Sequence, residues 1–190
     1  MESLEKQQST FGTKHVVPFE SKMVMRQTIE QTMERLPNGT RRLAALLRTP
    51  ISIESIWNVL TDYDNLSELI PNLVSSKIIG REGKRVQLEQ VGSQKLMGLT
   101  FSAQVQLELI ENRELGSLDF HLLKGDFRRF EGAWKMQQLS DGSGTCLLYE
   151  LTVQGCLGMP VALIEQRLRE DLTTNLLAVE KAAFKRPVAG

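Results

Sequence analysis

The sequence predicts an α+β domain in which an antiparallel sheet of about seven strands packs against one long C-terminal helix. Between residues 160 and 184, apolar residues recur every three or four positions, as Leu168, Leu172 and Leu176 illustrate, which is typical of an amphipathic helix. Upstream segments alternate apolar and polar residues, and the connections between them are too short for parallel crossovers. Because the helix has one apolar stripe and the strands have one apolar face, we expect the two to meet.

The N-terminal third is expected to hold a tail, a hairpin and two short helices. Residues 1–21 are polar and aperiodic, so we expect a flexible tail, one domain over residues 22–185 and a short tail at 186–190. Residues 23–36 fit either a helix or a strand, and the Asn38-Gly39 turn that follows favours a strand. Short helices are predicted from Ile53 to Leu60, behind an N-cap at Ser52, and over residues 64–70.

Six further strands are predicted between Pro71 and the final helix. Turn residues separate them, and the clearest alternation runs from Leu99 to Leu109. The predicted strands are Val74–Arg81, Lys84–Gln94, Leu99–Glu111, Ser117–Lys124, Phe127–Leu139 and Thr145–Gly155.

The inward face of this predicted sheet is mostly apolar and could enclose a ligand between sheet and helix. Gln90 and Tyr149 are its polar members, and each needs a hydrogen-bond partner, either a neighbouring protein group or a ligand. Small residues such as Ala45, Ala103 and Gly132 either make room for a ligand or seat the helix on the sheet. The candidate cavity residues are Gln90, Phe101, Ala103, Val105, Phe120, Leu122, Phe130, Trp134, Tyr149, Leu151, Ile164 and Leu168.

One end of the predicted sheet has unusually apolar connections. Alternate connections of a meander lie at the same end, and hairpin tips are usually polar. The apolar residues at this end are Leu96, Met97, Leu157 and Met159. They either plug the end of the core or form a portal for an apolar ligand, which could open during transient contact with a membrane.

Catalytic and cofactor-binding motifs are scarce. The two histidines, His15 and His121, are too far apart in the sequence to suggest a metal site. Lys124 and Asp126 are the one charged pair that we consider for catalysis, although a type II′ turn at Gly125 explains both without chemistry. We therefore predict no catalytic residue, no metal and no cofactor.

Charge and hydropathy limit the partners and the compartment. Lys plus Arg and Asp plus Glu both total 23, so no net charge steers the protein to nucleic acid. No segment is apolar enough to span a membrane, and the first residues lack the features of a secretory signal. Cys146 and Cys156 lie ten residues apart along one predicted extended segment, which separates them by about 33 Å, beyond disulfide reach. We expect a cytoplasmic protein, or one attached peripherally to a membrane.

Several short segments resemble the START-like superfamily, also known as polyketide cyclase/dehydrase, SRPBCC or Bet-v-1-like. They are Ile56–Asp64, Leu69–Leu73, Leu88–Gly92, Lys124–Phe127 and Gly132–Trp134. The resemblance covers roughly residues 23–184. Within the superfamily, the chain is similar to the coenzyme-Q-binding START branch, which is common in cyanobacteria and plastids. The resemblance implies a helix-grip fold, a curved sheet that grips the C-terminal helix, but it does not specify the ligand, since this superfamily hosts many functions.

Three functions are compatible with the sequence. The first is binding, sequestration or transport of a hydrophobic small molecule, such as a lipid, isoprenoid quinone, pigment or polyketide-like compound, with Gln90 or Tyr149 orienting its polar end. The second, a polyketide cyclase or dehydratase, is less favoured, because the family's enzymes use polar groups deep in the cavity and the inward faces here are mostly apolar. The third is an assembly factor that docks a protein partner through the apolar loop end.

Overall fold

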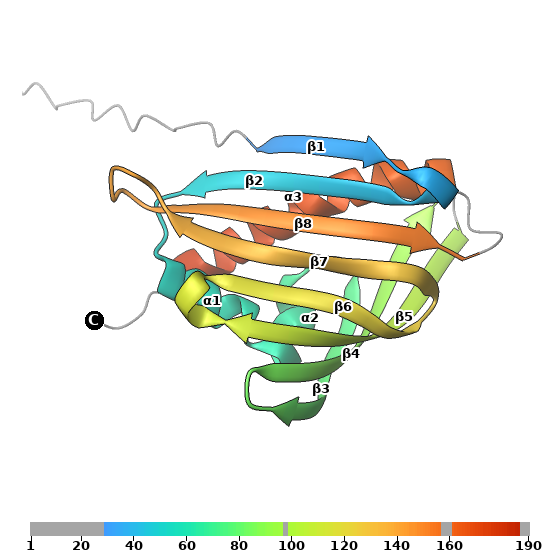
Figure 1. The fold of residues 1–190 in the computed structure, drawn as a ribbon, viewed down its shortest axis with the longest axis horizontal. Helices are drawn as coiled ribbons and strands as arrows, with labels where there is room; N and C mark the ends of the chain where they lie inside the picture. The colour runs from blue at the N-terminus through green and yellow to red at the C-terminus, as the bar shows by residue number, and fades with distance from the viewer. Residues whose placement is uncertain (1–28, 97–98, 157–160, 187–190) are drawn as a thin grey trace, which may run out of the picture.

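An eight-stranded antiparallel sheet and a long helix dominate the structure, a computed structural model that describes residues 29–96, 99–156 and 161–186 (Figure 1). The strands lie in the order β1-β2-β8-β7-β6-β5-β4-β3, so β3 to β8 form a meander and the β1-β2 hairpin joins it beside β8. The strands are β1 (Glu30–Arg35), β2 (Arg41–Thr49), β3 (Leu73–Glu82), β4 (Arg85–Leu96), β5 (Leu99–Asn112), β6 (Ser117–Gly125), β7 (Phe127–Gln138) and β8 (Thr145–Gly155). The helices are α1 (Ile53–Leu60), α2 (Leu66–Leu69) and α3 (Val161–Lys185).

The predicted α+β, helix-grip architecture is confirmed, with eight strands rather than about seven. The ambiguous segment contributes β1, which turns into β2 through Asn38 and Gly39, both in the left-handed region with φ of 58° and 73°. Ser52 caps α1 as predicted, because its side chain accepts a hydrogen bond from the backbone N–H of Ser55. The second short helix is a 3-10 turn followed by α2. Residues 1–28, which include the predicted tail, lie outside the described residues.

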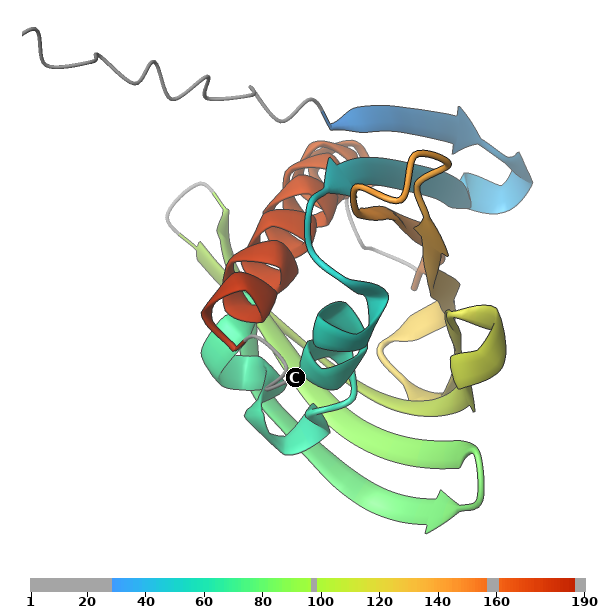
Figure 2. The same cartoon turned by 90° about the vertical axis from the view of Figure 1, so that its left-hand side faces the viewer.

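The hydrophobic core lies between the concave face of the sheet and α3 (Figure 2). The predicted stripe of α3 is buried from Leu172 onward, and Leu172, Leu176, Val179 and Ala183 are all at most 2% exposed. The helix packs chiefly against α1, β2 and β8. No helix in the described part of the chain is long and apolar enough to cross a membrane. The C-terminal part of α3 is thus packed over the half of the sheet that includes β2 and β8.

The N-terminal half of α3 is tied to the β1-β2 hairpin by Glu165. Its carboxylate accepts hydrogen bonds from Arg35, at 2.8 Å, and from Arg41, at 2.9 Å. These bonds, the one from Arg35 first, hold the pKa of the Glu165 carboxyl below its usual value of 4.5. The ionised form is therefore favoured by folding. Its contribution to stability is complete above the unfolded pKa and is lost as the pH falls through the folded pKa.

We expect Glu165→Gln to reduce the acid-side loss of stability, because the variant has no carboxylate to protonate. The free energy of unfolding, measured by urea denaturation at pH steps below 4.5, should fall less steeply for the variant than for the wild type. Glu34→Gln is the matched control, since its carboxylate lies 3.9 Å from the nearest guanidinium and is exposed. Parallel curves for wild type and Glu165→Gln would show that this tie does not stabilise the fold.

Candidate functional site

The concave face is closed at one end and accessible at the other. In the middle of β5 the inward residues are buried, as Leu107 and Val105 show at 4% and 8% exposed. Towards the N-terminal end of the strand, Ala103 is partly buried and Phe101 is 47% exposed. On β6 and β7, Leu122 and Phe130 are likewise partly buried at this end. The apolar lining therefore becomes accessible towards the β4-β5 hairpin.

A cleft of about 420 Å³ opens at this accessible end, between α3 and the β4-β5 hairpin. The described residues that line it are Asn72, Ser93, Gln94, Thr100 and Arg167. This lining is polar, whereas the sequence predicted apolar residues around an opening at the same end. The side chains of those predicted portal residues, Leu96, Met97, Leu157 and Met159, lie outside the described residues, so the portal stays a prediction.

Asp171 of α3 connects two elements of the cleft wall. Its carboxylate accepts hydrogen bonds from the side-chain amide of Asn72, at 3.2 Å, and from that of Gln94. Burial raises the pKa of the Asp171 carboxyl, and the two hydrogen bonds oppose this rise. Asp171 is not among the candidate residues predicted from the sequence. A signal was present, because Asp171 follows Ile164 by seven residues and Leu168 by three, which places it on the flank of the apolar stripe.

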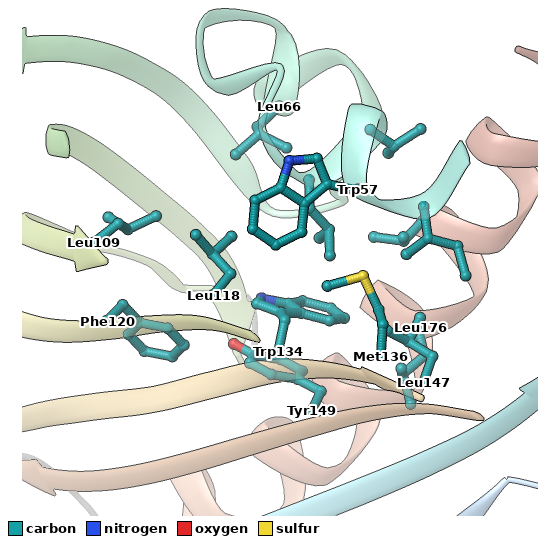
Figure 3. Packing of buried hydrophobic residues seen from close by; sticks show 14 of the residues in the cluster. Trp57, Leu66, Leu109, Leu118, Phe120, Trp134, Met136, Leu147, Tyr149 and Leu176 are labelled. Atoms are coloured by element: carbon teal, nitrogen blue, oxygen red, sulfur yellow. The ribbon is translucent and has the colours of Figure 1, made fainter. Parts of the chain in front are cut away.

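Tyr149 of β8 presents the second polar group of the interior. Its side chain is 8% exposed, and its ring stacks on Trp134 with centroids 3.9 Å apart and lies 6.3 Å from Phe120 (Figure 3). Fully buried polar side-chain atoms in the described ranges all have partners. No hydrogen bond of the Tyr149 hydroxyl is found within those ranges. Burial, followed by the charge of Asp171, raises the pKa of Tyr149.

Gln90, the other polar residue predicted to face inward, has a partner within the sheet. Its amide donates to the hydroxyl of Ser76 at 3.1 Å, and Ser76 is buried. This bond satisfies the donor without a ligand and supports the structural alternative for Gln90.

The small inward residues have different roles. A Cβ on Gly132 would lie 2.0 Å from the carbonyl oxygen of Glu150 and 2.7 Å from Cζ of Phe120, so this position has no room for a side chain. Ala45 is fully buried, whereas Ala103 is partly exposed at the accessible end. Of these three, Ala103 is the position that borders open space.

Lys124 and Asp126 occupy the turn between β6 and β7. The Asp126 carboxylate accepts a hydrogen bond from the backbone N–H of Gln104 at 2.7 Å, and its own N–H donates to the Gln104 carbonyl at 3.0 Å. Both side chains are exposed, and neither belongs to the described cleft lining. This geometry supports a structural role for the turn.

The candidate cavity residues form a gradient from core to opening. Val105, Phe120, Trp134, Tyr149 and Leu151 are buried, Gln90, Ala103, Leu122, Phe130 and Leu168 are partly buried, and Phe101 is exposed. Ile164 lies in α3 with its side chain outside the described residues. The rings of Phe120 and Phe130 lie 5.8 Å apart, so aromatic surface continues from the core towards the cleft. The described residues hold no cluster of metal-ligating side chains.

The same architecture is found in known proteins. The structure resembles the Zhui aromatase/cyclase from a Streptomyces species, at 13% identity over 80% of this chain and 98% of that chain, with a TM-score of 0.67. It also resembles a STAR-related lipid transfer protein from Xanthomonas axonopodis, at 14% identity over 82% and 93% of the chains and a TM-score of 0.68. A START superfamily protein from Mycobacterium smegmatis is 18% identical over 76% and 97%, with a TM-score of 0.62. Identities this low show a shared fold.

Comparison of the sequence with family models gives more specific information than these structural similarities. A search of curated proteins finds no significant match. The family model described as polyketide cyclase / dehydrase and lipid transport, however, matches residues 49–180, which is more than half of the chain. The chain therefore belongs to the polyketide cyclase/dehydrase and lipid transport family.

Proposed function

We propose that this protein binds a hydrophobic small molecule between the sheet and α3, to sequester or transport it. The observation that carries the proposal is the cleft of about 420 Å³ at the end where the inward apolar side chains become accessible. Small-molecule sites are typically clefts of roughly 300 to 1,000 Å³ with apolar walls and a few polar groups. The described lining of this cleft supplies polar groups, and the proposed apolar wall is the inward face of the sheet, where Phe101 pairs with Gln94 of the lining. The family description, which includes lipid transport, supports the same class of ligand.

The proposed ligand lies along the gradient from Phe101 to the Trp134-Tyr149 stack. The apolar body contacts inward residues of β5, β6 and β7, including Ala103, Leu122 and Phe130. Desolvation of this body supplies most of the binding free energy, at about 25 cal/mol per Å² of apolar surface. A lipid, an isoprenoid quinone such as coenzyme Q, a pigment or a polyketide-like compound satisfies this requirement.

Access to the site is proposed to require movement of the loops at the accessible end while α3 stays in place. Glu165 and Gln31 tie α3 to the β1-β2 hairpin, the latter by donating to the carbonyl of Arg169 at 2.9 Å. The buried leucines of α3 each contribute about 2 kcal/mol to the free energy of unfolding, so release of the whole helix is costly. At the other side of the cleft, the bonds found among the described residues are those that the Asp171 carboxylate accepts from the amides of Gln94 and Asn72. Opening there exposes the cleft without unfolding.

We expect Ala103→Phe to weaken binding of an apolar dye, because the new ring occupies the space beside Phe101. Titration with Nile red, followed by dye fluorescence, should show a Kd raised by about tenfold or more relative to the wild type. Gln104→Phe is the matched control, since this neighbouring side chain is exposed on the outer face. Equal affinities for wild type and Ala103→Phe would contradict a site between β5 and α3.

The two alternative functions predict different outcomes for the purified protein. Native mass spectrometry combined with solvent extraction should find an apolar molecule bound to a carrier. A cyclase or dehydratase would instead turn over a polyketide-like substrate, and Lys124→Ala or Asp126→Ala would abolish that turnover in a folded protein. An assembly factor would capture a protein partner and carry no organic molecule.

A further inference from the structure

The described residues that line the cleft are all polar, so the cleft suits the polar head of a ligand rather than its apolar body. Gln94 marks the boundary between the two regions, since its register partner on β5 is Phe101, which is 47% exposed. A ligand whose body lies along Phe101 therefore places its head among the lining residues. The hydrogen-bonding capacity and the charge of this lining decide which head group fits.

Two of the lining residues, Asn72 and Gln94, have amide oxygens that can accept hydrogen bonds from a ligand. Each donates its side-chain amide N–H to the Asp171 carboxylate, Asn72 at 3.2 Å. A carboxylate only accepts hydrogen bonds, so the nitrogen of each amide faces Asp171 and the carbonyl oxygen is left for another donor. No hydrogen bond to either carbonyl oxygen is found among the described residues. A head group with N–H or O–H donors matches these two acceptors.

Asn72 is held in place by its backbone as well as by its side chain. Its φ is 66°, in the left-handed region that asparagine tolerates better than most residues. Its backbone carbonyl accepts a hydrogen bond from the N–H of Ser93, another lining residue, at 2.8 Å. Together with the bond to Asp171, these contacts position the Asn72 amide before a ligand arrives, which reduces the entropic cost of binding.

The charges at the cleft are unfavourable for an anionic head. Arg167 is the one charged residue of the described lining, and its guanidinium lies 2.8 Å from the Glu170 carboxylate. Asp171 follows Arg167 by four residues, which places the two on the same face of α3. Among these described side chains, two carboxylates outnumber one guanidinium. A ligand carboxylate or phosphate would therefore meet net negative charge at the cleft.

We propose that the cleft selects an amphiphile whose head is uncharged and donates hydrogen bonds, and that it discriminates against carboxylate and phosphate heads. This inference rests on the proposed function. The amide oxygens of Asn72 and Gln94 accept the N–H or O–H groups of the head. A head that only accepts, such as an ester or a ketone, leaves both oxygens without a donor. An anionic head has the same defect and is also repelled by Asp171.

Decanamide, methyl decanoate and decanoate test the inference, because they share one acyl chain and differ only in the head. The amide is neutral and donates, the ester is neutral and only accepts, and decanoate is anionic. In competition with Nile red at neutral pH, decanamide should bind about fivefold more tightly than the ester and about tenfold more tightly than decanoate. Equal binding of all three, or tightest binding of the ester or of decanoate, would overturn the inference and leave the proposed function standing. If neither Nile red nor any of the three binds, both fail.

Two variants assign the discrimination to named residues. Asp171→Asn removes the negative charge, so the affinity for decanoate should rise about tenfold while that for methyl decanoate stays unchanged. Gln94→Met keeps the chain length but removes the amide oxygen, so decanamide should lose about fivefold in affinity and methyl decanoate nothing. Glu34→Gln is the matched control for loss of a carboxylate, since Glu34 belongs to β1 and is not part of the described lining. An equal change for all three probes in both Asp171→Asn and Gln94→Met would show a purely structural role and overturn the inference.

Discussion

Gly132→Ala should lower the free energy of unfolding by about 3 kcal/mol or more. Gly132 pairs with Phe120 on β6 and with Leu151 on β8. The Cβ of alanine would lie 2.0 Å from the Glu150 carbonyl oxygen. Because β8 is a central strand, its backbone cannot move away without disturbing the packing around it. Urea denaturation followed by far-UV circular dichroism measures the loss.

Gly92→Ala is the control for the general effect of replacing a glycine in this sheet. A Cβ there would meet only the carbonyl oxygen of Asn72, at an ordinary 3.6 Å. We expect a change of about 1 kcal/mol or less for this variant. Wild-type stability in Gly132→Ala would show that the space beside Phe120 is open at this position.

Leu176→Ala should lower the free energy of unfolding by about 3 kcal/mol, since it leaves a cavity under the middle of α3. Leu176 is completely buried and belongs to the cluster with Met136 and Leu147 (Figure 3). The same denaturation experiment measures this loss, and the slope with urea should stay unchanged.

The adjacent Leu177 provides a matched control, because it has the same side chain and is 40% exposed. We expect Leu177→Ala to change the free energy of unfolding by about 0.5 kcal/mol. Similar losses in the two variants would mean that α3 does not pack on the sheet through the stripe that includes Leu172 and Leu176. Core packing would then not hold α3 in place during ligand access.

The fold could be predicted wherever one face of a strand or helix is buried and the other is exposed to solvent. The alternation along β5 and β8 and the stripe from Leu172 to Ala183 match the observed burial. The β1 strand was ambiguous for a physical reason. It lies at the edge of the sheet, and most of its residues are exposed on both faces, so burial imposes no alternation on its sequence.

The site was harder to predict, because it depends on distances between segments that are remote in the sequence. Tyr149 could be singled out as a polar residue on an apolar face. Asp171 lies on the flank of the apolar stripe, but its partners Asn72 and Gln94 are remote from it in the sequence. The requirement for glycine at Gly132 likewise depends on the close approach of β8, which no local pattern encodes.

Photoaffinity labelling tests most directly the central claim that an apolar ligand lies between β5, β6, β7 and α3. A diazirine-bearing alkyl probe is photolysed on the folded protein, and the labelled peptides are mapped by mass spectrometry. We expect saturable labelling of Phe101, Leu122 and Phe130 that Nile red competes away and that Ala103→Phe diminishes. Labelling confined to exposed apolar residues of the edge strand β3, such as Val74 and Ile79, would contradict the claim.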